Sequence, residues 1–173
     1  MIERAGAVRM KGKLVTLVGD EVKVGVAAPD FEALDEGLQA IRLSSFLGKV
    51  VIVASVPSVD TAVCDLETKR FNEEAARLGD QVAVITVSMD LPFAQKRWCA
   101  AAGVNNVVLL SDHREASFGR SFGALIKELR LLARAVFVID QTGIVRYVQY
   151  VEEITAEPDY GEVVTAARRL LER

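Results

Sequence analysis

Two cysteines, Cys64 and Cys99, are the most reactive side chains in this sequence of 173 residues, and it contains no third. Cys64 lies where a run of β-branched residues has ended and a helix is expected to begin. The first turn of a helix presents unpaired backbone N–H groups and the positive end of the helix dipole. Both stabilise a thiolate over a thiol, and only the thiolate is nucleophilic. The position of Cys64 therefore indicates a reactive thiol, although the usual fate of a free cysteine is to be a small buried hydrophobic residue.

The charges around Cys64 include two that oppose a thiolate. Asp65 and Glu67 share the first turn of the expected helix and would disfavour the charged sulfur if they face it. A cation is therefore required nearby. Arg134, which directly precedes the predicted strand Ala135–Ile139, is the best candidate.

Thr61 and Pro57, which precede Cys64, each allow a structural and a functional interpretation. Thr61 lies one turn earlier and could be the N-cap of the helix, or its hydroxyl could contact a substrate beside the thiol. Pro57 fixes the chain as it leaves the preceding strand and could shield the thiolate from water, or it could simply end the strand.

Cys99 falls on a predicted helix, Leu91–Ala102, far along the chain from Cys64. The separation excludes a C-x-x-C redox motif and matches no zinc-ligand spacing. With His113 as the only histidine, neither a metal site nor a Cys–His hydrolase order can be read, and no phosphate-binding or dinucleotide-binding glycine motif is present. These patterns predict no metal site. In a reducing compartment, a bond between the two cysteines would be transient and catalytic rather than structural.

The hydrophobic pattern predicts an α/β arrangement that positions these residues. A β-branched strand precedes the Cys64 helix, a second buried strand precedes the Cys99 helix, and a β-hairpin and a closing helix follow. The order predicts a mixed sheet between helices, a three-layer sandwich compatible with a thioredoxin-like fold carrying an N-terminal hairpin at about residues 12–25. The expected elements are hairpin strands Lys13–Val18 and Glu21–Val24, extended segments Phe31–Leu34 and Gln39–Leu43, a helical turn Ser44–Gly48, strands Val50–Val56, Gln81–Met89, Val107–Leu110, Ala135–Ile139 and Ile144–Val151, and helices Val63–Leu78, Leu91–Ala102, Glu115–Phe122 and Tyr160–Leu171.

Composition narrows the class of protein. The net charge is −3, charged residues make up 26% and hydrophobic residues 51%, so neither a nucleic acid nor an anionic membrane surface is an expected partner. No linker or repeat divides the chain, and we expect one domain over residues 1–173.

The sequence contains no recognisable signal peptide and no apolar run long enough to cross a membrane, and we expect a cytoplasmic protein.

Four segments resemble one family in particular. Pro57-Ser58-Val59-Asp60-Thr61-Ala62-Val63-Cys64 resembles the peroxiredoxin pattern, in which a proline and a threonine precede the peroxidatic cysteine by seven and three residues. The similarity is greatest to the bacterial thiol peroxidases, which are atypical two-cysteine peroxiredoxins. The other three segments, in the same order as in that subfamily, are Ser88–Gln95, Ala133–Asp140 and Glu153–Tyr160.

The resemblance implies roles for the residues singled out above. Cys64 would be the peroxidatic cysteine and Cys99 the resolving one. Thr61 and Arg134 would complete the active site, and Pro57 would shield the thiolate from water. It implies reduction of hydrogen peroxide and organic (alkyl) hydroperoxides, an intramolecular disulfide reduced by thioredoxin, no cofactor, and a homodimer. Since two cysteines on different helices of a packed domain cannot readily reach bonding distance, we expect both helices to unwind locally in each cycle.

Two other functions remain open from the residues themselves. The chain could be a thioredoxin-like binding or chaperone domain whose cysteines are incidental, or a thiol–disulfide exchange domain acting on proteins. The threonine and arginine near Cys64 argue against the first function, and the lack of C-x-x-C argues against the second.

Overall fold

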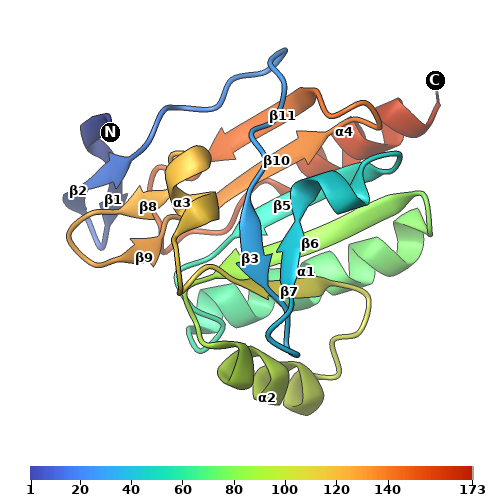
Figure 1. Cartoon of the computed structure of the whole chain (residues 1–173), viewed down its shortest axis with the longest axis horizontal. Helices are drawn as coiled ribbons and strands as arrows, with labels where there is room; N and C mark the ends of the chain where they lie inside the picture. The colour runs from blue at the N-terminus through green and yellow to red at the C-terminus, as the bar shows by residue number, and fades with distance from the viewer. Residues whose placement is uncertain (173) are drawn as a thin grey trace.

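The computed structural model describes residues 1–172 and contains two sheets (Figure 1). The larger has the strand order β11-β10-β5-β6-β7-β3-β4 and the smaller the order β1-β2-β8-β9. Strand β5 is parallel to β6, and β6 to β7, whereas β10 is antiparallel to β5, so the central sheet is mixed as predicted. The elements are β1 Glu3–Met10, β2 Lys13–Val18, β3 Glu32–Leu34, β4 Ala40–Arg42, a 3₁₀ turn Leu43–Phe46, β5 Val50–Ser55, α1 Ala62–Leu78, β6 Val82–Ser88, α2 Pro92–Ala102, β7 Val108–Ser111, α3 Ser117–Ser121, β8 Leu125–Ile126, β9 Leu131–Leu132, β10 Ala135–Ile139, β11 Val145–Tyr150 and α4 Tyr160–Leu171.

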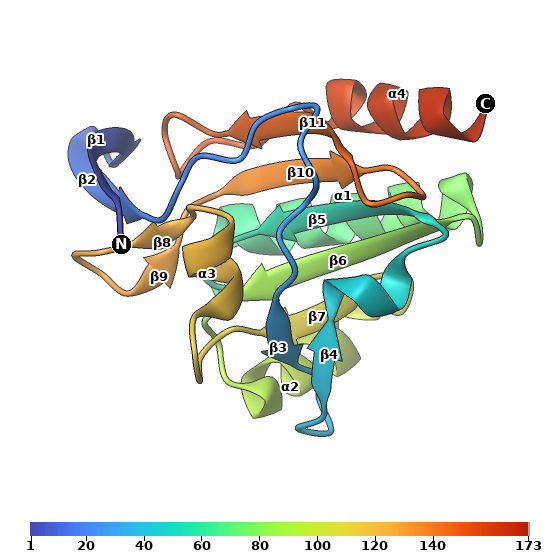
Figure 2. The ribbon, with the colours of Figure 1, turned by 45° about the horizontal axis from the view of Figure 1, so that its top comes forward.

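The central strand β5 is buried on both faces, which is why its sequence is a continuous β-branched run. Val51 and Val53 pack into one hydrophobic core, and Val50 and Ile52 into another on the opposite face. Figures 1 and 2 show α3 in front of the sheet and α1 behind it, and side chains of α2 and α4 join the same core as those of α1. The predicted three-layer α/β arrangement is confirmed.

Local sequence signals set the ends of the helices that carry the two cysteines. Helix α1 begins after Thr61, which caps it, and ends at Gly79, whose φ of 80° a residue with a side chain rarely adopts. Helix α2 has Pro92 in its first turn and ends at Gly103 in the left-handed conformation. Each helix follows a loop at the carboxyl end of a central strand, and because β5 and β6 are parallel, both helices begin at the same end of the sheet.

The N-terminal hairpin exists, but it uses different residues from those predicted. Strand β2 pairs antiparallel with β1, across a turn in which Lys11 and Gly12 both have positive φ. Gly19, which lies between the two hairpin strands predicted from the sequence, instead lets two backbones approach closely, because a Cβ on it would lie 2.1 Å from the carbonyl oxygen of Arg120.

The predicted second hairpin strand, Glu21–Val24, is wrong. This segment runs across to β11 rather than pairing with β2. The Val22 N–H donates to the Tyr150 hydroxyl at 3.0 Å, and the Gly25 N–H donates to the Val145 carbonyl at 2.8 Å. Strand β2 instead pairs with β1 on one side and with β8 on the other, so neither of its edges is free for a hairpin with Glu21–Val24.

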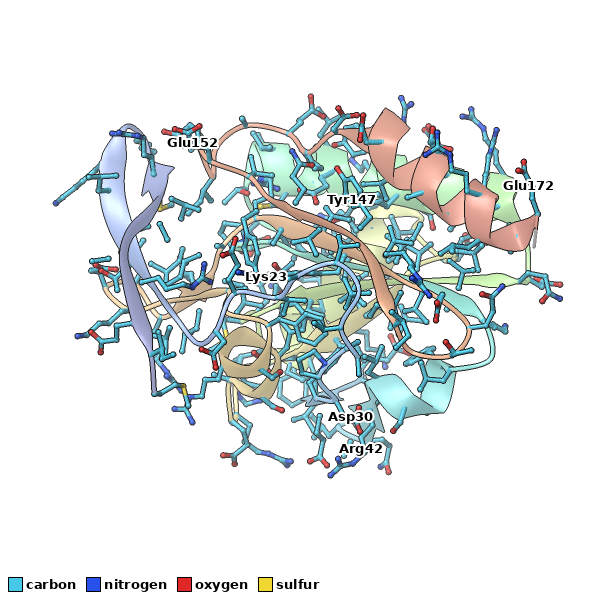
Figure 3. All side chains as sticks on the ribbon, turned by 90° about the horizontal axis from the view of Figure 1, so that it is seen from above. Lys23, Asp30, Arg42, Tyr147, Glu152 and Glu172 are labelled. Atoms are coloured by element: carbon cyan, nitrogen blue, oxygen red, sulfur yellow. The ribbon has the colours of Figure 1, made fainter. Side chains whose placement is uncertain are left out.

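Charged side chains lie around the outside of this core. Figure 3 shows Asp30 and Arg42, an ion pair at 3.6 Å, side by side at one edge and Glu152 and Glu172 at others. None of the helices among residues 1–172 combines the length and apolar character needed to cross a membrane.

Candidate active site

The loop between β5 and α1 places Cys64 in the first turn of α1. The Cys64 side chain is fully buried, and Pro57 is buried in the loop before it. The Cys64 N–H donates to Thr61 Oγ1 at 3.4 Å, so the N-cap interpretation of Thr61 is confirmed. The Thr61 hydroxyl in turn donates to the Ser58 carbonyl at 3.1 Å, and the Thr61 side chain itself is exposed. A thiol in this position receives the field of the helix N-terminus without contact with bulk water.

Arg134 reaches Cys64 through the register of the sheet. Because Ala135 of β10 pairs with Ser55 of β5, the preceding Arg134 lies level with the start of the loop that leads to Cys64. Arg134 Nη2 donates to Cys64 Sγ at 3.2 Å. The side chain is only 2% exposed, so its charge acts on the sulfur with little screening by solvent.

Two further contacts fix the guanidinium in place, and a third fixes the backbone beside it. Arg134 Nε donates to the Ile154 carbonyl at 2.7 Å, and Nη1 donates to Glu67 Oε2. The Ser55 hydroxyl donates to the Ala133 carbonyl at 2.7 Å and holds the backbone beside Arg134 against β5. A donor aimed at the sulfur before any substrate binds needs no reorganisation during a reaction there.

The two acidic residues of the first turn have different orientations. Asp65 turns away from the sulfur and accepts from Lys69 Nζ at 2.9 Å and from Trp98 Nε1 at 2.8 Å. The hydrogen bond from Lys69, and then that from Trp98, lower the pKa of Asp65 despite partial burial. Asp65 is therefore a charged link between α1 and α2 and does not face the thiol.

Glu67 is buried and forms the partner of Arg134. Burial raises the pKa of Glu67 to about 7, although the charge and hydrogen bond of Arg134 offset part of this effect. Burial opposes the charge on Arg134, but the charges of Glu67 and Cys64 outweigh it and raise the pKa of Arg134. Glu67 thus orients a permanently charged guanidinium, a role the residue types alone did not reveal. Its position three residues after Cys64, on the same helical face, was the available signal.

Cys99 has a different environment from Cys64. It is a half-buried free thiol on α2 and, with Gln95 and Glu36, lines a cavity of about 310 Å³. Burial, and then the charge of Glu36, raise the pKa of Cys99. Cys99 is therefore held as a neutral thiol, whereas Cys64 faces a cation and a helix N-terminus.

The described part of the chain offers no obvious place for a metal. No group of three or more His, Cys, Asp or Glu side chains among residues 1–172 is arranged to hold one. The chemistry that the observed groups can perform is nucleophilic attack by Cys64 on a small molecule oriented by Arg134 and by backbone N–H groups at the start of α1.

Comparison with known proteins identifies the family. The model of the Redoxin family matches residues 23–164. The chain belongs to the redoxin family. A thiol peroxidase from Bacillus subtilis (strain 168) is 56% identical over 164 residues, covering 95% of this chain and 98% of that protein. A thiol peroxidase from Clostridium acetobutylicum is 52% identical over 161 residues, or 93% of this chain and 97% of that protein.

Solved structures agree with this placement. The crystal structure of a peroxiredoxin-like protein from Aquifex aeolicus matches with a TM-score of 0.89 and 45% identity, over 96% of this chain and 99% of that one. A thiol peroxidase from Chromobacterium violaceum, at 22% identity and a TM-score of 0.81 over 95% and 94% of the two chains, shares the fold. The thioredoxin-like fold and the peroxiredoxin family of the resemblance are confirmed, and the relatives indicate an enzyme of the peroxidase type.

Proposed function

We propose that this redoxin-family protein is a thioredoxin-dependent thiol peroxidase in which Cys64 attacks hydrogen peroxide or an organic hydroperoxide. The contact between Arg134 Nη2 and Cys64 Sγ, 3.2 Å long and fully buried at a helix start, carries this proposal. Arg134 offers a positive charge to the thiolate, and the fixed donors around it stabilise charge that develops on the peroxide oxygens. The shared family with named thiol peroxidases supports the same chemistry.

The proposed first half-reaction transfers one oxygen atom to the sulfur. The thiolate attacks the terminal peroxide oxygen, an S–O bond forms as the O–O bond breaks, and the departing alkoxide or hydroxide takes up a proton to leave as alcohol or water. Cys64 becomes a sulfenic acid. Thr61 keeps the first turn of α1 in place for this step through its cap on the Cys64 N–H, and Pro57 keeps water from the sulfur.

The proposed second half-reaction regenerates the thiol. The Cys99 thiol attacks the Cys64 sulfenic sulfur, forming the intramolecular disulfide and releasing water. Thioredoxin then reduces this disulfide by two successive thiol exchanges, and we expect no metal or organic cofactor. We further propose that residues 1–173 act as one domain in a homodimer in the cytoplasm, where a reducing thiol pool sustains the cycle.

Peroxide consumption coupled to thioredoxin and its reductase tests this function. The intact protein should consume hydroperoxide continuously, Cys64→Ser should fall to background, and Cys99→Ser should react once per chain and then stop. Equal consumption by Cys64→Ser and the intact protein would overturn the proposal. Reduction of insulin without consumption of peroxide would instead favour a disulfide-exchange domain, and neither activity would favour a binding domain.

A further inference from the structure

A carboxylate outside the site just described joins the Cys64 loop to the helix that carries Cys99. Asp90 lies between β6 and α2. Its Oδ1 accepts from the Ser58 hydroxyl at 2.7 Å, and its Oδ2 accepts from the Val59 N–H at 2.9 Å and the Ser88 hydroxyl at 2.6 Å. Ser58 and Val59 belong to the loop between β5 and α1. One side chain therefore joins the loop before Cys64, which disulfide formation would have to rearrange, to the segment that precedes the Cys99 helix.

The side of this link nearer to α2 is firmly anchored. The Ser111 hydroxyl donates to the Asp90 carbonyl at 2.6 Å. Gln95, only 2% exposed, donates through Nε2 to the Ser88 hydroxyl and to the Leu110 carbonyl, both at 2.9 Å. The start of α2 is thereby fastened to β6 and β7, and Asp90 holds the loop from a rigid base.

The other side of the link leads directly to the thiol. The Ser58 carbonyl accepts from both the N–H and the hydroxyl of Thr61, at 3.3 and 3.1 Å. Thr61 in turn caps α1 at the Cys64 N–H. Asp90 does not touch Cys64. A chain of hydrogen bonds connects them, from Asp90 to Ser58, from Ser58 to Thr61 and from Thr61 to the Cys64 N–H.

We propose that Asp90 is a positioning residue that keeps the Cys64 loop closed in the state that attacks peroxide and must release it before Cys64 meets Cys99. The inference rests on the proposed function. If the loop exchanges between a closed and an open state, the rate of attack on peroxide is proportional to the fraction of molecules in the closed state. The rate of disulfide formation is proportional to the fraction in the open state. When the closed state dominates, weakening the link multiplies the small open fraction but scarcely lowers the large closed one.

The consequence is an unequal effect on the two steps. Loss of a charge-assisted hydrogen bond shifts such an equilibrium by about tenfold or more. Asp90→Ala should therefore form the disulfide about tenfold faster after one equivalent of peroxide, while Cys64 oxidation slows by less than about twofold. The variant should also resist overoxidation about tenfold better, because a second peroxide must convert the sulfenic acid to sulfinic acid before Cys99 reacts.

Asp140 provides a matched control. Its carboxylate closes the β10–β11 turn by accepting from the Thr142 N–H and hydroxyl and from Arg146 Nε, at 2.7–2.9 Å. Asp140→Ala should lower thermal stability without changing the ratio of the two rates. Ser58→Ala, which removes one of the bonds from the loop side, should shift the ratio in the same direction as Asp90→Ala but less, and Asp90→Asn should fall between the intact protein and Asp90→Ala.

Rapid-mixing kinetics with mass analysis of quenched samples measures both steps in each variant. Faster disulfide formation in Asp90→Ala and Ser58→Ala, with the Asp140→Ala ratio unchanged, supports the inference. If Asp90→Ala does not fold, Ser58→Ala and Asp90→Asn decide the question. A ratio equal to that of the intact protein in all the Asp90 and Ser58 variants that fold overturns the inference while leaving the peroxidase intact. Failure of Cys64 to oxidise in the intact protein would instead overturn the proposed function.

Discussion

The two cysteines differ in the charges and dipoles that surround them. Cys64 faces the Arg134 guanidinium and the positive end of the α1 dipole. Cys99 has a raised pKa because it is partly buried and lies near Glu36. Of the two, Cys64 is suited to attack a peroxide, while Cys99 is suited to wait as a thiol until a sulfenic acid reaches it.

Arg134 donates hydrogen bonds to the Ile154 carbonyl, to Glu67 and to the Cys64 sulfur. Replacing it removes the donor that is fixed toward the sulfur. Arg134→Ala should slow Cys64 oxidation by peroxide by about 10²–10³-fold, the usual effect of removing one preorganised donor. Arg134→Lys should recover only part of the rate, since an ammonium cannot hold Ile154, Glu67 and the sulfur in a fixed fork. Rapid-mixing kinetics measures both variants.

Two further variants control for side effects of this substitution. Arg42→Ala, which loses only exposed ion pairs, should leave the rate unchanged. Because Arg134→Ala strands the buried Glu67, the double variant with Glu67→Gln tests whether folding rather than chemistry has failed. Oxidation of a folded Arg134→Ala protein at the normal rate would remove Arg134 from the account.

At the residue scale, signals within one segment were readable from the sequence and contacts across the sheet were not. The cap by Thr61 follows from its position one turn before Cys64. The choice of Arg134 came from chemical need and family resemblance. The pairing of Glu67 with Arg134 and the hydrogen bond from Ser58 to Asp90 depend on which strands are neighbours and on their register. No local sequence pattern encodes that arrangement.

The elements explain how the two cysteines could meet. Cys64 has no exposed surface, and Cys99 lies on a separate helix whose Trp98 is bonded to Asp65 of α1. The proposed disulfide therefore requires the first turn of α1 and the Cys99 end of α2 to open. The start of α2, anchored by Gln95, has no need to move.

Hydrogen exchange on reduced and oxidised protein tests this division. Oxidation should lower the protection of residues 62–66 and of 97–102, and leave that of β5 and β6 unchanged. The fluorescence of Trp98, the only tryptophan, should change in step because its bond to Asp65 is lost. Identical protection in the two redox states would contradict the opening of both helices.

The strands show where element prediction succeeded and failed. The buried strands β5 and β6 are long β-branched runs and were found almost to the residue. Strands β8 and β9 are two residues each and carry no periodicity. Strand β1 was missed because Gly6 and a register shift between Arg4 and Val8 interrupt its alternation. Its turn, Lys11-Gly12, also lacks the usual Asn-Gly or Asp-Gly signal.

For the whole molecule, two buried carboxyls give stability a pH dependence. Burial raises the pKa of Glu67 to about 7 and that of Asp112 to about 6, in spite of the charge and hydrogen bonds that favour their ionised forms. The folded state then holds more protons than the unfolded state between about pH 4 and 7. The free energy of unfolding should therefore fall as pH rises through this window.

Glu67→Gln isolates the larger of these contributions. The decline in unfolding free energy between pH 4.5 and 7 should become smaller, by on the order of 2 kcal/mol, because the amide that replaces the carboxyl does not titrate in this range. Glu73→Gln, an exposed change on the same helix, should keep the slope of the intact protein. Denaturant titrations at several pH values measure the free energy of unfolding. Equal slopes against pH for the intact protein, Glu67→Gln and Glu73→Gln would show that Glu67 has an ordinary pKa.

The central claim is that Cys64 attacks and Cys99 resolves, and intact-mass analysis after one equivalent of peroxide tests it most directly. Reduced Cys99→Ser should gain one oxygen, located by peptide mapping on Cys64. The unaltered protein should lose two hydrogens and yield a single peptide pair joined through Cys64 and Cys99. Oxygen first found on Cys99, or a Cys64→Ser variant oxidised as fast as the intact protein, would contradict the account.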